Sequence, residues 1–257
     1  MRLGVCTYGW TPTVFPEGLD YLEASIPKLL VPREPESVFD EKRREVADCP
    51  LPIEGGIIFL PSDLKSTGPE VNEQELDAFV ETTLRRAHAV GMKVIAFGSG
   101  GSRKVPEGFP HEEAMAQLEG HLKRWSVKAQ ELGLVFAVEP LKSAETNIIN
   151  RVSEGAELAR RVGKRNVGVL ADTYHMMCEG EGPDAIVSAG ELIVHVHCAE
   201  EEGRSAPGTH GEDFRPFFRA LKEIDYQGRI SIESGWGDPQ KELAGAVRYL
   251  REQYETA

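Results

Sequence analysis

Short apolar segments of strand length recur along the whole chain, and many of them are rich in β-branched residues. Eight such segments occupy residues 2–7, 21–26, 52–60, 93–98, 134–139, 167–172, 192–197 and 229–234. Between the later segments the apolar residues follow a helical period, most clearly over 73–91, 112–133 and 149–163. Each of these three stretches ends at a glycine, which commonly terminates a helix. Strands that alternate with helices in this way predict parallel βαβ units.

Eight strands with alternating helices predict a (β/α)8 TIM barrel, a fold that typically takes about 250 residues. The alternative is a doubly wound open sheet. Little more than WTPTVFPEG (10–18) separates the first two strands, so we expect the first helix to be missing or reduced. The segment DYLEASIPKLL (20–30) could also be a helix. No linker rich in Pro, Gly or Ser divides the sequence, and we expect residues 1–257 to form one TIM-barrel domain.

The formal net charge of −13 argues against a nucleic-acid partner, because proteins that bind duplexes usually carry a basic surface. No apolar run approaches the roughly 20 residues that span a bilayer. The four cysteines are scattered, which is typical of reduced thiols rather than of a disulfide framework. We therefore expect a cytoplasmic protein without a membrane partner; the oligomeric state, a homo-oligomer included, stays open.

Four of the predicted strands end in a side chain that can bind a metal, namely Glu139, Asp172, His197 and Glu233. Their spacings are 33, 25 and 36 residues, about one βα unit each. Because the strands of a parallel barrel all point the same way, these four side chains should meet at its C-terminal mouth. Taken singly, each also has a structural explanation: a solvated strand end, a helix cap, a core histidine or an ion pair.

Three carboxylates packed together would raise one another's pKa unless a cation joins them. One imidazole with three carboxylates suits a divalent ion such as Mn²⁺, Co²⁺, Mg²⁺ or Zn²⁺. The sequence therefore predicts one divalent metal ion bound by Glu139, Asp172, His197 and Glu233.

Three further features deserve a prediction of their own. Arg103 lies in the glycine-rich run 97–109, which could hold an anion or form a plain lid loop. His195 should face the same way as His197 but one layer deeper, where a core position is expected. Aromatic rings near strand ends could stack on a bound ligand, although core packing is the default; they are Trp10, Phe59 and Trp236.

The chain resembles the xylose isomerase-like TIM barrels, the sugar phosphate isomerase/epimerase group that includes ketose 3-epimerases and hydroxypyruvate isomerase. The resemblance is carried by VEPLKSAETN (138–147), LADTYHM (170–176), VHVHCAEEEGRSAPG (194–208) and ISIES (230–234). It implies that the four strand-end residues bind the metal, that His175 and Arg204 contact the substrate, and that Glu145 also lies at the substrate. Lys142-Ser143 departs from the Asn-Arg of many relatives, which leaves the sugar undetermined.

The resemblance further implies an isomerase in which Glu139 and Glu233 move a proton α to a ketose carbonyl, while the metal stabilises the charge that develops. The substrate would be a small sugar or sugar phosphate. Proton return to C3 gives epimerisation, and return to C2 gives aldose–ketose isomerisation. The alternatives are a metal-dependent lyase or dehydratase acting on a polyol or keto-acid, an AP endonuclease-like hydrolase, and a non-catalytic sugar-binding barrel. With 7 histidines and an acidic balance, the hydrolase is disfavoured.

Overall fold

The computed structural model describes residues 1–9 and 11–257 and shows a closed barrel of eight strands in sequential order. The strands are β1 Arg2–Thr7, β2 Tyr21–Ser25, β3 Ile53–Ile57, β4 Val94–Phe97, β5 Val135–Val138, β6 Val167–Asp172, β7 Ile193–Cys198 and β8 Arg229–Ile232. The closing contact is parallel, with Arg2 of β1 opposite Arg229 of β8. A doubly wound sheet would leave two open edges, so the TIM-barrel prediction is confirmed.

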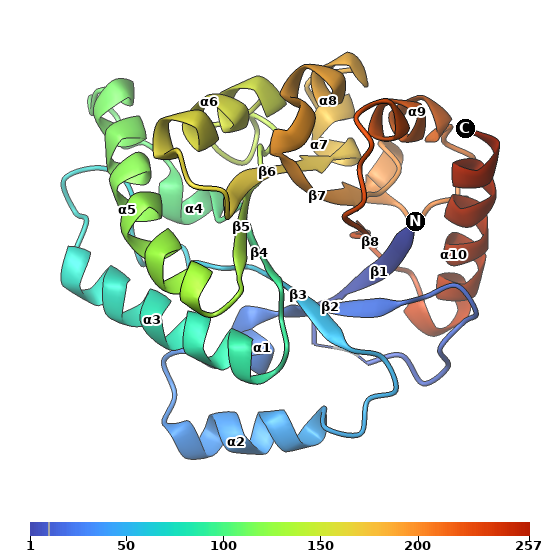
Figure 1. Ribbon diagram of the computed structural model, residues 1–257, viewed down its shortest axis with the longest axis horizontal. Coiled ribbons are helices and arrows are strands. Elements are labelled where there is room, and N and C mark those ends of the chain that lie inside the picture. Colours follow the sequence, from blue (N-terminus) through green and yellow to red (C-terminus); the bar gives the residue numbers. More distant parts are fainter. Residues whose placement is uncertain (10) are drawn as a thin grey trace.

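Helices surround the barrel (Figure 1). They are α1 Ile26–Leu29, α2 Glu36–Glu45, α3 Glu73–Ala89, α4 Gly100–Arg103, α5 His111–Glu131, α6 Val152–Val162, α7 Thr173–Cys178, α8 Asp184–Ala189, α9 Arg215–Glu223 and α10 Pro239–Thr256, with the 3-10 turns η1 Gly190–Leu192 and η2 Glu202–Arg204. Within the described part of the chain, no helix is both long enough and apolar enough to cross a membrane.

The first βα unit is reduced, as the sequence predicted. Among the described residues between Thr7 and Tyr21 the chain forms turns and loop without a helix. The strand interpretation of 21–25 is correct, and the helical alternative applies only from Ile26, where α1 begins directly after β2. Helix α2 was not predicted. Phe39 is its one buried side chain, so its sequence carries almost no apolar stripe.

The third strand is shorter than the predicted 52–60. It ends at Ile57 because Ile58 adopts the left-handed conformation, with φ of 58°, which breaks the extended backbone. The glycines expected to terminate helices do have positive φ: 92° at Gly91, 69° at Gly133 and 64° at Gly163.

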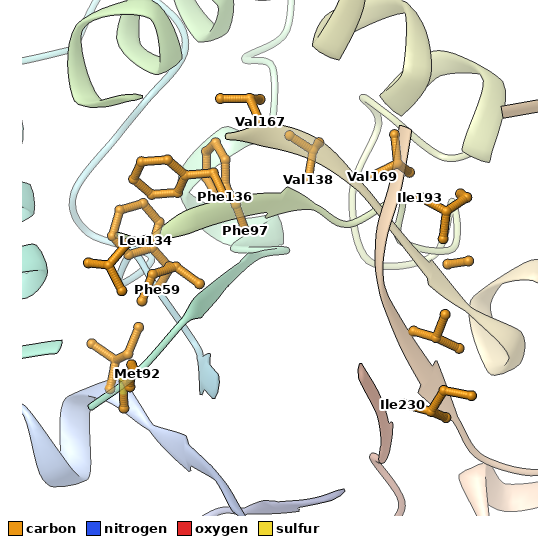
Figure 2. Packing of buried hydrophobic residues seen from close by; sticks show 14 of the residues in the cluster. Phe59, Met92, Phe97, Leu134, Phe136, Val138, Val167, Val169, Ile193 and Ile230 are labelled. Atoms are coloured by element: carbon orange, nitrogen blue, oxygen red, sulfur yellow. The ribbon is translucent and has the colours of Figure 1, made fainter. Parts of the chain in front are cut away.

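The apolar core lies mainly between the outer face of the barrel and the helices. Figure 2 shows part of this layer, with Phe59, Phe97 and Phe136 gathered beside the strands. The rings of Phe59 and Phe97 pack edge to face with centroids 5.6 Å apart. Phe59 is therefore a core residue and contributes about 2 kcal/mol by burial, rather than a surface on which a sugar could stack.

A second, smaller apolar cluster fills part of the barrel interior; it contains Cys6, Ile57, Val94, Ala96, Ala137 and Leu170. Strand residues alternate between this interior and the outer layer, as the pleat requires. The same alternation sets the direction of the polar side chains. Leu170 and Asp172 of β6 share the inner face, and Ala137 of β5 shares it with Glu139.

Candidate active site

The four residues that the sequence singled out meet at the C-terminal mouth of the barrel. Asp172 is the last residue of β6 and His197 lies near the end of β7, while Glu139 and Glu233 directly follow β5 and β8. Each offers one ligand atom, and these four atoms all lie within 4.8 Å of one another. All four residues are at most 7% exposed. The donor set, three carboxylates and an imidazole in a buried cluster, fits a divalent cation.

Opposite charges face one another at this cluster and shift the pKa values of its members. Burial alone would raise the pKa of Glu233, but the charges of His197 and Arg204 lower it to about 2. Burial would likewise lower the pKa of His197, yet the carboxylates of Glu233 and Glu23 contribute to raising it well above its usual range. The first shift arises because two cationic side chains face Glu233, and the second arises in part because carboxylates surround His197.

Asp172 combines two roles that the sequence left as alternatives. Its Oδ1 accepts a hydrogen bond of 2.8 Å from the backbone N–H of Tyr174, so it is the N-cap of α7. Its Oδ2 faces the site and accepts a hydrogen bond of 3.3 Å from Nη2 of Arg204. The cap therefore holds the carboxylate in place through Oδ1 and leaves Oδ2 directed at the other site residues.

The two ring nitrogens of His197 face different parts of the site. Its Nδ1 lies 3.0 Å from Oε2 of Glu233 and 3.7 Å from Oε1 of Glu139. Its Nε2 faces the barrel interior, 3.3 Å from Oε2 of Glu23. The nitrogen directed at the carboxylates of Glu139 and Glu233 is therefore Nδ1.

His175 and Arg204, which the resemblance places at the substrate, both border this cluster. His175 in α7 accepts the backbone N–H of Lys142 at Nδ1, over 3.2 Å. A proton on Nε2 is consistent with this bond, and Nε2 lies 3.7 Å from Oδ2 of Asp172. This buried atom has no hydrogen-bond partner among residues 1–9 and 11–257. It is a donor directed into the site.

Arg204 closes the other side of the cluster. Its Nη2 donates to Oε2 of Glu233 over 2.6 Å, and its guanidinium lies over the ring of Tyr174, 4.9 Å from the centroid. The loop that carries Arg204 is held by the fully buried Glu200, whose carboxylate accepts the backbone N–H groups of Gly208 and His210 at 2.7 and 2.6 Å. The loop that carries Arg204 is therefore fixed by hydrogen bonds from its backbone to Glu200.

Glu145 lies apart from the four-residue cluster. Its side chain is 40% exposed, and Oε1 lies 3.7 Å from Nζ of Lys142. That ammonium donates to the hydroxyl of Tyr174 over 2.5 Å. The structure therefore places Glu145 on the outer rim, together with the lysine that departs from the family pattern.

Arg103 does not serve as an anion site. Its side chain is fully buried, and its guanidinium donates to the backbone carbonyls of Phe97 and Glu139 over 2.9 and 2.5 Å. It joins the ends of β4 and β5, so its side chain bonds within the fold instead of facing an anion, and residues 100–103 of the run form the short helix α4. His195 lies deeper than His197 as predicted, with Nε2 2.8 Å from Oε2 of Glu23.

Two site residues were missed in the sequence. Tyr8 follows β1, and its hydroxyl donates to Oε1 of Glu233 over 2.5 Å. Glu23 lies inside β2, and a charged residue in the middle of an apolar strand was the signal that could have revealed it. An open pocket of about 410 Å³ beside the cluster is lined by Tyr8, Arg204, Ser234, Gly235, Trp236 and Pro239. Trp10, the third aromatic suggested for sugar stacking, lies outside the described residues.

Comparison with known proteins shows which family the chain belongs to. A family model described as xylose isomerase-like TIM barrel matches residues 18–253. A probable ketose 3-epimerase of Synechocystis sp. is 34% identical over 156 residues, or 56% of this chain and 53% of that protein. The aligned part thus spans about half the length of that curated relative.

Two solved structures are similar in fold. D-allulose 3-epimerase from Methylomonas sp. in complex with D-allulose superposes with a TM-score of 0.82 at 22% identity, covering 99% of this chain and 97% of that one. The IOLI protein with a binding zinc atom gives a TM-score of 0.72 at 17% identity, covering 98% and 96%. Because the family model covers most of the sequence, the chain belongs to the xylose isomerase-like TIM barrel family.

Proposed function

We propose that this protein is a divalent-metal-dependent sugar epimerase or isomerase that moves a proton α to a ketose carbonyl between Glu139 and Glu233. The observation that carries the proposal is the buried cluster in which ligand atoms of Glu139, Asp172, His197 and Glu233 lie within 4.8 Å of one another. Membership of a family with a ketose 3-epimerase relative supports the reaction class.

The four clustered residues would hold the cation. When bound, a divalent ion supplies Lewis-acid polarisation of the ketose carbonyl and stabilises the negative charge that develops on its oxygen. The IOLI protein, which has a similar fold, carries a zinc atom, and this supports the proposal of a metal ion. Among Mn²⁺, Co²⁺, Mg²⁺ and Zn²⁺, the donor set favours no single ion.

Glu139 and Glu233 would carry the proton. They come from β5 and β8, so they approach the site from two separate strands. In the proposed reaction one carboxylate removes the proton from the carbon next to the carbonyl, and the other returns a proton to the opposite face of the same carbon. Glu233 contacts His197 and Arg204, which favour its ionised form, the form that can take up a proton.

His175 and Arg204 would bind the oxygens of the substrate. The Nε2 proton of His175 has no partner within the described chain, and a sugar hydroxyl or carbonyl oxygen would complete its hydrogen bonding. Arg204 donates to two site carboxylates and also lines the open pocket beside them. A small sugar or sugar phosphate fits these donors, and the sugar-bound structure of similar fold supports a sugar.

The experiment is solvent isotope exchange. Protein loaded with Mn²⁺ is incubated in D₂O with a panel of ketoses and ketose phosphates, and NMR reads deuterium at C1, C2 and C3. Deuterium at C3 together with a new epimer is expected. Exchange at C1 with aldose formation would instead identify aldose–ketose isomerisation.

The matched control is Glu202→Gln, because Glu202 is an exposed glutamate on the same rim and its side chain is 79% exposed. This variant should exchange as the wild type does. Absence of exchange with every sugar, in protein that demonstrably binds Mn²⁺, would overturn the proposed activity. Absence of Mn²⁺ binding would favour a non-catalytic barrel.

A further inference from the structure

A chain of buried polar side chains lies in the barrel interior directly beneath the candidate metal cluster. It comprises Tyr21, Glu23, His195, His197 and Ser231, all of them 0% exposed. Charged and polar groups are rarely buried so completely unless they are mutually hydrogen-bonded. Their arrangement links β2, β7 and β8 across the interior.

One oxygen is the centre of this chain. Oε2 of Glu23 lies 2.8 Å from Nε2 of His195, 3.3 Å from Nε2 of His197 and 2.6 Å from Oγ of Ser231. The Ser231 hydroxyl is in turn 2.7 Å from the hydroxyl of Tyr21. An ionised carboxylate can only accept, so this geometry requires all three neighbours to donate to it.

A proton on Nε2 of His197 determines the state of the other ring nitrogen, Nδ1. A histidine binds a metal ion as the neutral imidazole, which carries one proton; with that proton on Nε2, Nδ1 has a free lone pair. Nδ1 is the atom that faces Glu139 and Glu233 at the mouth. Metal-binding histidines generally have their tautomer fixed by such a partner on the second nitrogen.

We propose that Glu23 is a positioning residue that holds the proton of His197 on Nε2 and thereby directs the lone pair of Nδ1 at a divalent cation. The inference rests on the proposed metal site but adds a residue from β2, a strand that supplies none of the four clustered ligands. Space for the carboxylate is provided by Gly55 on the neighbouring strand. A Cβ at that position would lie 2.6 Å from Cδ of Glu23.

Glu23→Gln separates positioning from packing. The amide keeps the size of the side chain, but one of its two polar atoms is an NH₂ donor. It therefore no longer requires a proton on Nε2 of His197. The expected result is a 10- to 100-fold weaker affinity for Co²⁺, the range typical for loss of such a partner. Ser231→Ala is the matched control. It removes one donor to the same oxygen yet leaves the acceptor for His197, and its Co²⁺ affinity should stay close to that of the wild type.

In the first measurement, each metal-free protein is titrated with Co²⁺, and binding is monitored by calorimetry and by visible absorption. The second is ¹⁵N NMR of the histidine rings in the Zn²⁺-loaded wild type, where His197 should ligate through Nδ1 and keep its proton on Nε2. This second measurement decides the question even if Glu23→Gln does not fold.

Wild-type Co²⁺ affinity in a folded Glu23→Gln protein, or ligation of Zn²⁺ through Nε2 of His197, would overturn the role of Glu23 while leaving the metal site standing. A wild-type protein that binds neither Co²⁺ nor Zn²⁺ would overturn the metal site, and the role of Glu23 with it.

Discussion

Nη2 of Arg204 and Oε2 of Glu233 are joined by a hydrogen bond of 2.6 Å, which brings the loop after β7 onto a residue that follows β8. A charged hydrogen bond of this kind is worth about 1.5–3 kcal/mol when it forms to a substrate oxygen. We therefore expect Arg204→Ala to lower kcat/KM by about 10- to 100-fold without loss of metal, because Arg204 offers only cationic donors.

The measurement for this variant pairs steady-state kinetics with elemental analysis of the purified protein. Arg204→Lys is the informative companion, since it keeps the charge but loses the planar fork. Loss of metal from Arg204→Ala, or full activity on the true substrate, would show that Arg204 has another role.

Glu139→Gln and Glu233→Gln test the two proton-transfer groups. Each amide keeps the volume of the glutamate but cannot take up a proton, and a positioned acid or base contributes about 10²–10⁴-fold to a rate. Both variants should lose turnover by that factor, measured as deuterium exchange at the substrate α-carbon with metal occupancy checked separately. Normal exchange in both metal-loaded variants contradicts the assignment.

Glu54 ties the opposite end of the barrel, where its Oε2 accepts hydrogen bonds of 3.1 Å from Arg2 and 2.6 Å from Arg229. Burial acts to raise the pKa of Glu54, but the two arginines outweigh it and the pKa is lowered. A lowered folded-state pKa stabilises the fold above about pH 4.5, the value of a free glutamate, and this stabilisation is lost as pH falls through the folded-state pKa.

We accordingly expect Glu54→Gln to reduce the free energy of unfolding at pH 7 by roughly 1 kcal/mol, with the difference from wild type shrinking below about pH 4. Urea denaturation at several pH values measures it. Glu131→Gln is the control, because Glu131 is 61% exposed and forms an ion pair with Lys128 on the same helix. A difference for Glu54→Gln that stays constant down to acid pH would argue against the ion pair.

The barrel and the mouth of the site could be predicted because both follow from strand periodicity. A strand that ends in an acid or an imidazole places that side chain on one rim, whatever the loops do, and Glu139, Asp172, His197 and Glu233 lie there. Helix α2 was not found in this way because its sequence, ESVFDEKRRE, contains only two apolar residues, Val38 and Phe39, of which Phe39 is buried.

Side-chain direction within loops was the harder part. Arg103 follows a glycine-rich run and could point either to solvent or inward, and only the fold shows it bonded to the carbonyls of Phe97 and Glu139. Glu23 is local to β2, but its partners His195 and His197 are more than 170 residues away in sequence, at separations of 172 and 174. Pairings of that length leave no trace in local periodicity.

Gly98 gives the last prediction, because it leaves the space in which Glu139 sits. A Cβ at Gly98 would lie 2.3 Å from Oε2 of Glu139, which is far closer than any real contact. The clash falls on the movable end of a side chain, so Gly98→Ala should fold while the carboxylate is displaced. A misplacement of about 1 Å at a reacting group costs on the order of 10²-fold in rate.

For Gly98→Ala, isotope exchange should therefore be slower and Co²⁺ affinity lower than in the wild type, with the melting temperature little changed. Gly245→Ala in α10 is the matched control, because a Cβ there meets no atom of residues 1–9 and 11–257 within 4 Å outside its own helix and alanine favours the helix. It should exchange normally and melt slightly higher. Normal exchange in Gly98→Ala would mean that Glu139 does not need its present position to transfer a proton.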